Sequence, residues 1–171
     1  RLKKDFPIVI EEAMKVTSYG SLLKVCRDLL HEKIPIIDML TIIEAVADIA
    51  EFTKAPEVLL EHVRAKLYRL ITQKFKDTDG VLHIITIKPE LEQQFIGKIQ
   101  EHHGVSQLML SIAEINNLVT KTKKLLDSIE VKGFSKITMV VDPILRKRIS
   151  EIYEKFGLQV SVLSHAELDS K

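Results

Sequence analysis

The segment from Ile137 to Leu163 constrains the fold most, because it has the pattern of a strand, a helix and a second strand. Ile137 to Val141 and Gln159 to Leu163 are short runs rich in β-branched residues, which is typical of buried strands. Between them, an Asp-Pro pair beginning at Asp142 and a glycine at Gly157 are typical of the two ends of a helix. This order predicts two parallel strands joined by a right-handed crossover.

The residues upstream of this unit change in character at Lys76–Gly80, a polar segment that ends in glycine. Residues 1–76 show helical periodicity throughout, whereas the β-branched run at 81–87 is typical of a strand. We therefore predict a fold of the α+β or α/β class. It consists of a helical subdomain at 1–76, a junction at 77–80, and a small α/β subdomain at 81–171 that contains the parallel βαβ unit.

Local signals place several helix boundaries within this frame. Ser18 and the Ser111–Glu114 capping box predict the starts of two helices. The apolar spacing predicts one continuous helix over 56–71 and another over about 89–100, each opened by a proline. Residues 101–104 are predicted to form a loop.

The overall composition excludes several classes of protein. The net charge is only +1, which argues against a dedicated nucleic-acid binder. Cys26 is the single cysteine, so no internal disulfide can form and a cytosolic setting is favoured. The longest run without a charged residue, 102–113, is too short to cross a bilayer. Because the chain begins with arginine and has no signal-peptide pattern, we expect a fragment of a longer protein.

The candidate reactive residues lack the neighbouring acidic, basic or metal-binding residues that catalysis needs. Asp142 lies at the exit of a strand but is interpreted as a helix cap, since no second acidic cluster for Mg²⁺ follows a strand. No glycine-rich phosphate loop and no HExxH or Cys/His metal spacing is present. We therefore expect no catalytic residue, cofactor or metal. Two alternatives stay open: an enzyme of phosphoryl or acyl transfer using Asp142 or His165, and an RNA-binding module using the basic residues of 64–76.

Two stretches carry an ordered set of motifs. The first runs from Leu29 to Ile71 and contains Ile34-Pro35-Ile36-Ile37-Asp38, Thr41-Ile42-Ile43-Glu44, Ala55-Pro56-Glu57 and Val63-Arg64. The second runs from Val140 to Leu168 and covers the end of the first strand, the helix and the second strand of the predicted βαβ unit. Together they resemble the FlhA-type export-gate family of flagellar and virulence type III secretion systems. Ala55 departs from the aspartate that is frequent at this position in the family, so the helix after it is expected to be less firmly capped.

The resemblance implies that the chain is the last two subdomains of the family's cytoplasmic domain. In that case it is a non-catalytic docking and ring-forming module at the cytoplasmic side of the bacterial inner membrane, and its parent chain is membrane-embedded. The implied partners are other export-gate subunits in a nine-membered homo-oligomeric ring, export chaperone–substrate complexes, and components of the export ATPase and its stalk. The resemblance also implies that this segment binds no nucleic acid and does not itself insert into the membrane. The family's main chaperone-docking cleft is expected upstream of Arg1.

Four charged residues within the first stretch are predicted to contact partners or neighbouring subunits. Asp38 and Glu44 belong to the helix after the Ile-Pro turn, and Arg64 and Arg69 belong to the next predicted helix. All four are expected to be exposed, because charged side chains on helices usually face solvent. Each is therefore a candidate contact residue of the helical subdomain.

Overall fold

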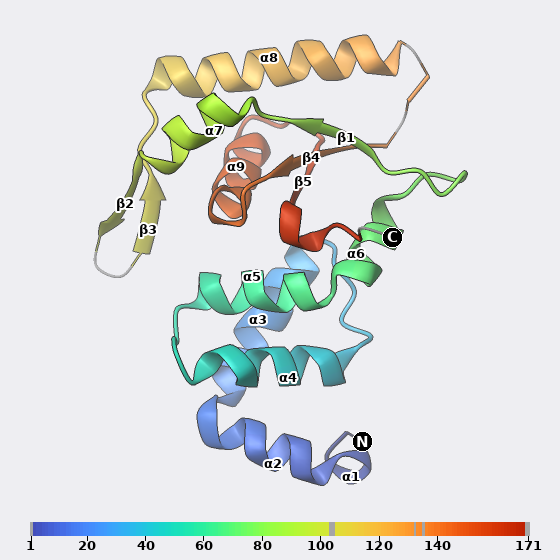
Figure 1. Ribbon diagram of the computed structural model, residues 1–171, viewed down its shortest axis with the longest axis vertical. Helices are drawn as coiled ribbons and strands as arrows, with labels where there is room; N and C mark the ends of the chain where they lie inside the picture. The colour runs from blue at the N-terminus through green and yellow to red at the C-terminus, as the bar shows by residue number, and fades with distance from the viewer. Residues whose placement is uncertain (1, 103–104, 132, 135, 170–171) are drawn as a thin grey trace. The chain divides into compact units, whose positions relative to one another are not determined.

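The computed structural model describes residues 2–102, 105–131, 133–134 and 136–169. The chain divides into two compact units, Arg1–Ile71 and Thr72–Lys171. One unit is helical and the other contains a parallel sheet, which confirms the predicted α+β or α/β class (Figure 1). The predicted junction at 77–80 lies inside the second unit. Among the described residues, no helix combines the length and apolar character that a membrane span requires.

The first unit is built from helices. They are α1 (Leu2–Asp5), α2 (Pro7–Val16), α3 (Tyr19–His31), α4 (Met39–Ala50) and α5 (Pro56–Lys66), and α6 (Tyr68–Phe75) begins in this unit. The predicted cap at Ser18 is confirmed, because its hydroxyl accepts a 3.1 Å hydrogen bond from the Ser21 backbone N–H. Ile10 and Ala13 of α2 pack with Ile43 of α4 in one apolar cluster. The helical periodicity of the sequence therefore marks the faces that are buried.

The prediction of one continuous helix over 56–71 is wrong. The helix α5 ends at Lys66, and the Leu67 N–H donates to the carbonyls of Val63 and Arg64 at 3.0 and 3.1 Å. Leu67, which is 3% exposed, is thus kept in the interior while the chain begins a new helix. No glycine or proline marks this break, and the apolar spacing runs on across it, so the sequence pattern predicts a single helix.

The second unit contains a three-stranded parallel sheet and a separate two-stranded hairpin. Its elements are β1 (His83–Thr86), α7 (Pro89–Ile96), β2 (Ile99–His102), β3 (Val105–Leu108), α8 (Ile112–Glu130), β4 (Ile137–Val141), α9 (Pro143–Lys155), β5 (Ser161–Ser164) and η1 (His165–Glu167). The sheet order is β1-β4-β5, and both pairs are parallel. This confirms the predicted βαβ unit and adds β1 as its neighbour.

One face of this sheet forms the core of the second unit. Ile85, Met139 and Val162 are register partners on the three strands, and all three are buried. They pack against buried residues of the helices: Phe95 of α7, Leu118 of α8, and Leu145, Ile149 and Tyr153 of α9. Burial raises the pKa of the Tyr153 hydroxyl to about 12. That hydroxyl lies 2.9 Å from the Thr122 hydroxyl and donates to the Met139 sulfur at 3.1 Å, so it is not left unsatisfied.

The hairpin of β2 and β3 corrects two predictions. The helix expected to reach about Gln100 ends at Ile96, and residues 101–102 of the expected loop belong to β2, while 103–104 lie outside the described residues. Ile99 and Leu108 are register partners, and both pack against the apolar core of the unit. This tertiary packing stabilises β2 as a strand, and the local sequence pattern carries no information about such packing. Figure 1 shows the hairpin projecting where α7 ends and α8 begins.

The predicted capping box at the start of α8 is confirmed. The Ser111 hydroxyl accepts from the Glu114 N–H at 3.2 Å, and the Glu114 carboxylate accepts from the Ser111 N–H at 2.9 Å. Lys98 also donates to this carboxylate. The bond from Lys98 and then those from Ser111 lower the pKa of Glu114 from its ordinary 4.5 to about 2.

This shift predicts a pH-dependent stability. The folded chain holds Glu114 ionised more firmly than the unfolded chain does, so the stabilisation is complete above about pH 4.5 and is lost as the pH falls toward 2. Glu114→Gln should flatten the fall of the thermal unfolding midpoint between pH 5 and pH 3, measured by circular dichroism. Glu151→Gln, at an exposed position of α9, should leave the fall unchanged. Parallel curves for the wild type and Glu114→Gln would contradict the assignment.

Candidate functional site

Asp38, which precedes α4, and Glu44 within α4 are both exposed, as expected. Asp38 is also the N-cap of α4: its carboxylate accepts from the Thr41 backbone N–H at 3.2 Å and from the Thr41 hydroxyl at 2.8 Å. Glu44 lies further along the same helix. Asp38 thus has a structural role that by itself explains an acidic residue at this position.

The expectation that Arg64 is exposed is wrong, because its relative exposure is 1%. Arg64 follows Val63 and lies one turn after Leu60, and both of those residues are buried, so its side chain belongs to the interior face of α5. Its guanidinium donates to the carboxylate of Glu32 at the end of α3. The charge of Arg64 therefore serves an internal ion pair, and its guanidinium does not belong to the exposed surface.

Arg69 on α6 is exposed and is oriented by its neighbour. Its Nε donates to the Tyr68 hydroxyl at 2.8 Å, and its guanidinium lies 5.4 Å from the centre of the Tyr68 ring. On α5, Lys66 lies 3.6 Å from an Asp48 oxygen, with both side chains at least half exposed. Because Arg64 is buried, the residues of 64–76 offer less exposed positive charge than the RNA-binding alternative requires.

The enzyme alternative concerns the edge of the sheet where its parallel strands end. The Asp142 carboxylate accepts from the Ile144 N–H at 2.9 Å, which confirms its prediction as the N-cap of α9. The Asp142 N–H donates to Glu92 of α7 at 2.7 Å, and the other Glu92 oxygen lies 4.0 Å from Nε2 of His165. No sequence motif marks Glu92, because it reaches this edge only through the packing of α7. Within the described part of the chain, no three acidic, histidine or cysteine side chains are placed to hold a metal ion.

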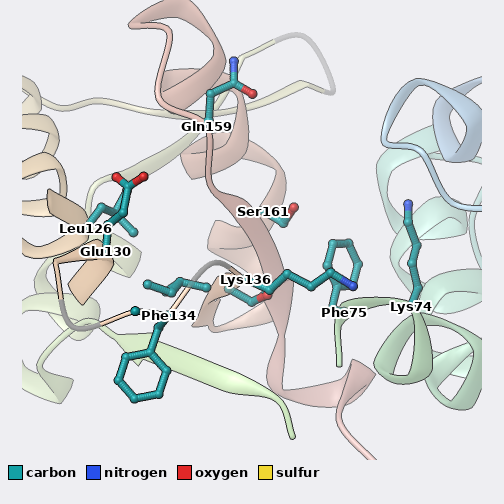
Figure 2. A pocket seen from close by; sticks show the side chains of 11 residues that line it. Lys74, Phe75, Leu126, Glu130, Phe134, Lys136, Gln159 and Ser161 are labelled. Carbon is teal, nitrogen blue, oxygen red and sulfur yellow. The ribbon is translucent and has the colours of Figure 1, made fainter. Parts of the chain in front are cut away.

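A hollow with a volume of about 720 Å³ lies at the opposite edge of the sheet, where β4 and β5 begin. It is lined by Lys74, Phe75, Leu126, Glu130, Gly133, Phe134, Lys136, Ile137, Thr138, Gln159 and Ser161. We call it the strand-start hollow. Figure 2 shows Phe75 from the end of α6, Phe134 and Lys136 from the segment before β4, and Gln159 and Ser161 around it. The lining residues come from three separate parts of the sequence, so no sequence motif predicts the site.

A second, smaller hollow of about 230 Å³ lies between α7 and α8. Leu91 and Phe95 of α7 and Leu118 and Leu125 of α8 give it an apolar lining, and Met139 of β4 also contributes to it. Leu118 and Leu125 belong to the apolar stripe that the sequence shows on α8. That stripe is thus only partly used by the core of the unit.

Comparison with known proteins places the whole chain in one family. The model of the FHIPEP family matches residues 1–171. The flagellar biosynthesis protein FlhA of Helicobacter pylori is 40% identical over 170 residues, which are 99% of this chain and 23% of that protein. The chain thus spans about a quarter of the length of the curated relatives it matches.

Solved structures share the fold. The cryo-EM structure of nonameric EPEC SctV-C has a TM-score of 0.87 at 19% identity, covering 99% of this chain and 50% of that one. The complex of the Chlamydia pneumoniae proteins CdsV and CdsO has a TM-score of 0.84 at 22% identity, with 99% and 49% covered. None of these names is that of an enzyme, in agreement with the predicted non-catalytic role. The full-length family match, supported by this shared fold, shows that the chain belongs to the FHIPEP family, as its resemblance to FlhA-type export-gate proteins predicts.

Proposed function

We propose that this chain is a non-catalytic docking and ring-forming module of a flagellar or type III protein-export gate. The observation that carries the proposal is the family match over all 171 residues, together with a 40% identical relative named as a flagellar biosynthesis protein. The polar residues that catalysis would recruit instead have structural partners, as at Asp142 and Glu92. The proposed location is the cytoplasmic face of the bacterial inner membrane, with the parent chain embedded in that membrane.

Ring formation is the first part of the proposed role. It is supported by the nonameric state of EPEC SctV-C, which has the same fold over 99% of this chain. Asp38, Glu44 and Arg69 are exposed and charged, so they remain proposed contact residues between subunits or with partners. Arg64 is withdrawn from this set, because a buried guanidinium is not available to a neighbouring subunit.

Partner docking is the second part. The complex of CdsV with CdsO supports a proposal that export ATPase or stalk components dock on this module. Export chaperone–substrate complexes are proposed as further partners of the full protein, with their main cleft upstream of Arg1. In this role the module supplies a folded surface for other proteins, and no bond is made or broken on it.

The proposal is tested on the full-length parent protein. We expect the detergent-solubilised protein to form a closed ring that cryo-EM resolves as nine subunits. A photo-crosslinking amino acid at Glu44 or Arg69 should crosslink to a second subunit or to a stalk component in membranes. The same amino acid at exposed Lys123 of α8 serves as the control position. A protein that stays monomeric at all concentrations and crosslinks no more at Glu44 and Arg69 than at Lys123 would refute the proposed role.

A further inference from the structure

The strand-start hollow combines three kinds of chemical group. Phe75 and Phe134 supply aromatic surface, and Leu126 and Ile137 supply aliphatic surface. Gln159, Thr138 and Ser161 supply amide and hydroxyl groups, and Thr138 and Ser161 are register partners on β4 and β5. Lys74 and Lys136 supply ammonium groups. Apolar surface with a few convergent polar groups is the usual composition of a binding site.

The aromatic wall at Phe134 is held in place by neighbouring residues. The Phe134 ring lies 4.7 Å from the His83 ring, centre to centre. His83 in turn has its Nε2 2.7 Å from the Asp77 carboxylate. That carboxylate also accepts from the backbone N–H groups of Asp79 and Val81, at 2.9 and 2.8 Å. The wall is therefore partly preorganised, which lowers the entropy cost of binding.

The charge of the hollow favours an anionic ligand. Lys136 donates to the Lys76 carbonyl at 3.1 Å, which uses one of the three N–H bonds of its ammonium group. Lys74 has its ammonium 5.1 Å from the centre of the Phe75 ring. The lining thus contains two lysines and one acidic residue, Glu130, and Lys136 is the lysine whose ammonium group has further N–H bonds for an anionic ligand. The described lining contains no arginine fork and no glycine-rich loop, which are the usual means of holding a phosphate.

We propose that the strand-start hollow binds an extended peptide segment of a partner protein, in which a carboxylate lies next to an aromatic or aliphatic side chain. The apolar side chain packs against Phe75 and Phe134, and the carboxylate pairs with Lys136. Hydroxyl and amide groups at the start of β5 are available to the peptide backbone. This inference goes beyond the proposed function, because it names a ligand chemistry and does not depend on ring formation.

The test uses the full chain and a fluorescein-labelled peptide in which glutamates alternate with phenylalanine and leucine. Fluorescence anisotropy should show saturable binding that weakens with salt, and a peptide with lysines in place of the glutamates should bind at least about tenfold more weakly. Lys136→Glu should reduce the affinity for the acidic peptide by at least about tenfold. Lys123→Glu is the matched control, because it reverses one exposed lysine on α8 that does not line the hollow, and it should change affinity little.

A second variant separates the site from general electrostatics. Phe134→Ala keeps the charge and changes a side chain that is 42% exposed, so the fold should persist, and circular dichroism checks this. It should weaken the acidic peptide severalfold and leave the thermal midpoint nearly unchanged. Two results would overturn the proposal. One is an equal loss of affinity for the acidic peptide in Lys136→Glu and Lys123→Glu. The other is that sulfate displaces the labelled peptide as effectively as unlabelled peptide does. Ring assembly of the parent protein is measured separately, so a negative result here leaves the proposed function standing.

Discussion

Replacing Glu167 with alanine is expected to lower the free energy of unfolding by about 3–5 kcal/mol, because it removes the carboxylate beside a buried guanidinium. Glu167 and Arg146 are 0% and 1% exposed, and Glu167 Oε1 lies 3.8 Å from Arg146 Nε. A cationic group in this environment loses its hydration on folding and depends on the opposite charge. The loss should therefore exceed that of any surface substitution in the second unit.

The backbone around Glu167 explains why this pair cannot simply move apart. The Thr72 hydroxyl donates to the Glu167 carbonyl at 2.8 Å and accepts from the Asp169 N–H at 3.1 Å. These bonds hold the segment that carries the carboxylate against the start of the second unit. The side chain consequently has little freedom to reach solvent when its partner changes.

Urea unfolding followed by circular dichroism measures the effect of Glu167→Ala. Glu151→Ala is the matched control, since it removes an exposed carboxylate of α9 and should change stability by no more than about 0.5 kcal/mol. The double variant Arg146→Met with Glu167→Leu should recover much of the loss, because it removes both buried charges. A Glu167→Ala variant as stable as the control would show that the pair contributes nothing.

The sequence predicts those parts of the fold that local interactions determine. Ser18, Ser111 and Asp142 cap helices through bonds to backbone groups two or three residues away, and such bonds are visible in a short window. The βαβ unit follows from periodicity and from the handedness of parallel crossovers. The family can be recognised from the order of the motifs along the chain, whereas the amino-acid composition alone does not identify it.

The parts that the sequence does not predict depend on residues distant in the chain. Arg64 is buried because it follows Val63 on the inner face of α5, and Glu32, half the first unit away in sequence, makes that burial tolerable. The pattern of charges around Arg64 instead suggests a solvated face. The hairpin of β2 and β3 and the strand-start hollow likewise come from packing between separate elements. Candidate binding surfaces are therefore harder to predict than helix ends.

The burial of Arg64 leads to the second large effect. Arg64→Ala should lower the free energy of unfolding by about 3–5 kcal/mol, since it removes the cation beside Glu32, whose side chain is 15% exposed, and deletes a fully buried side chain. Lys66→Ala on the same helix is the control: its contact with Asp48 is exposed, and such pairs contribute about 0–1 kcal/mol.

A rescue experiment distinguishes the ion pair from simple packing. Arg64→Met keeps most of the side-chain volume but leaves the Glu32 carboxylate without this guanidinium, so it should still be clearly destabilised. Adding Glu32→Gln removes the remaining charge, and the double variant should regain a large part of the loss in urea unfolding. If Arg64→Met is as stable as the wild type, the ion pair has no net value and Arg64 is retained for another reason. If Arg64→Ala resembles Lys66→Ala, the side chain is exposed in solution and returns to the set of contact residues with Asp38, Glu44 and Arg69.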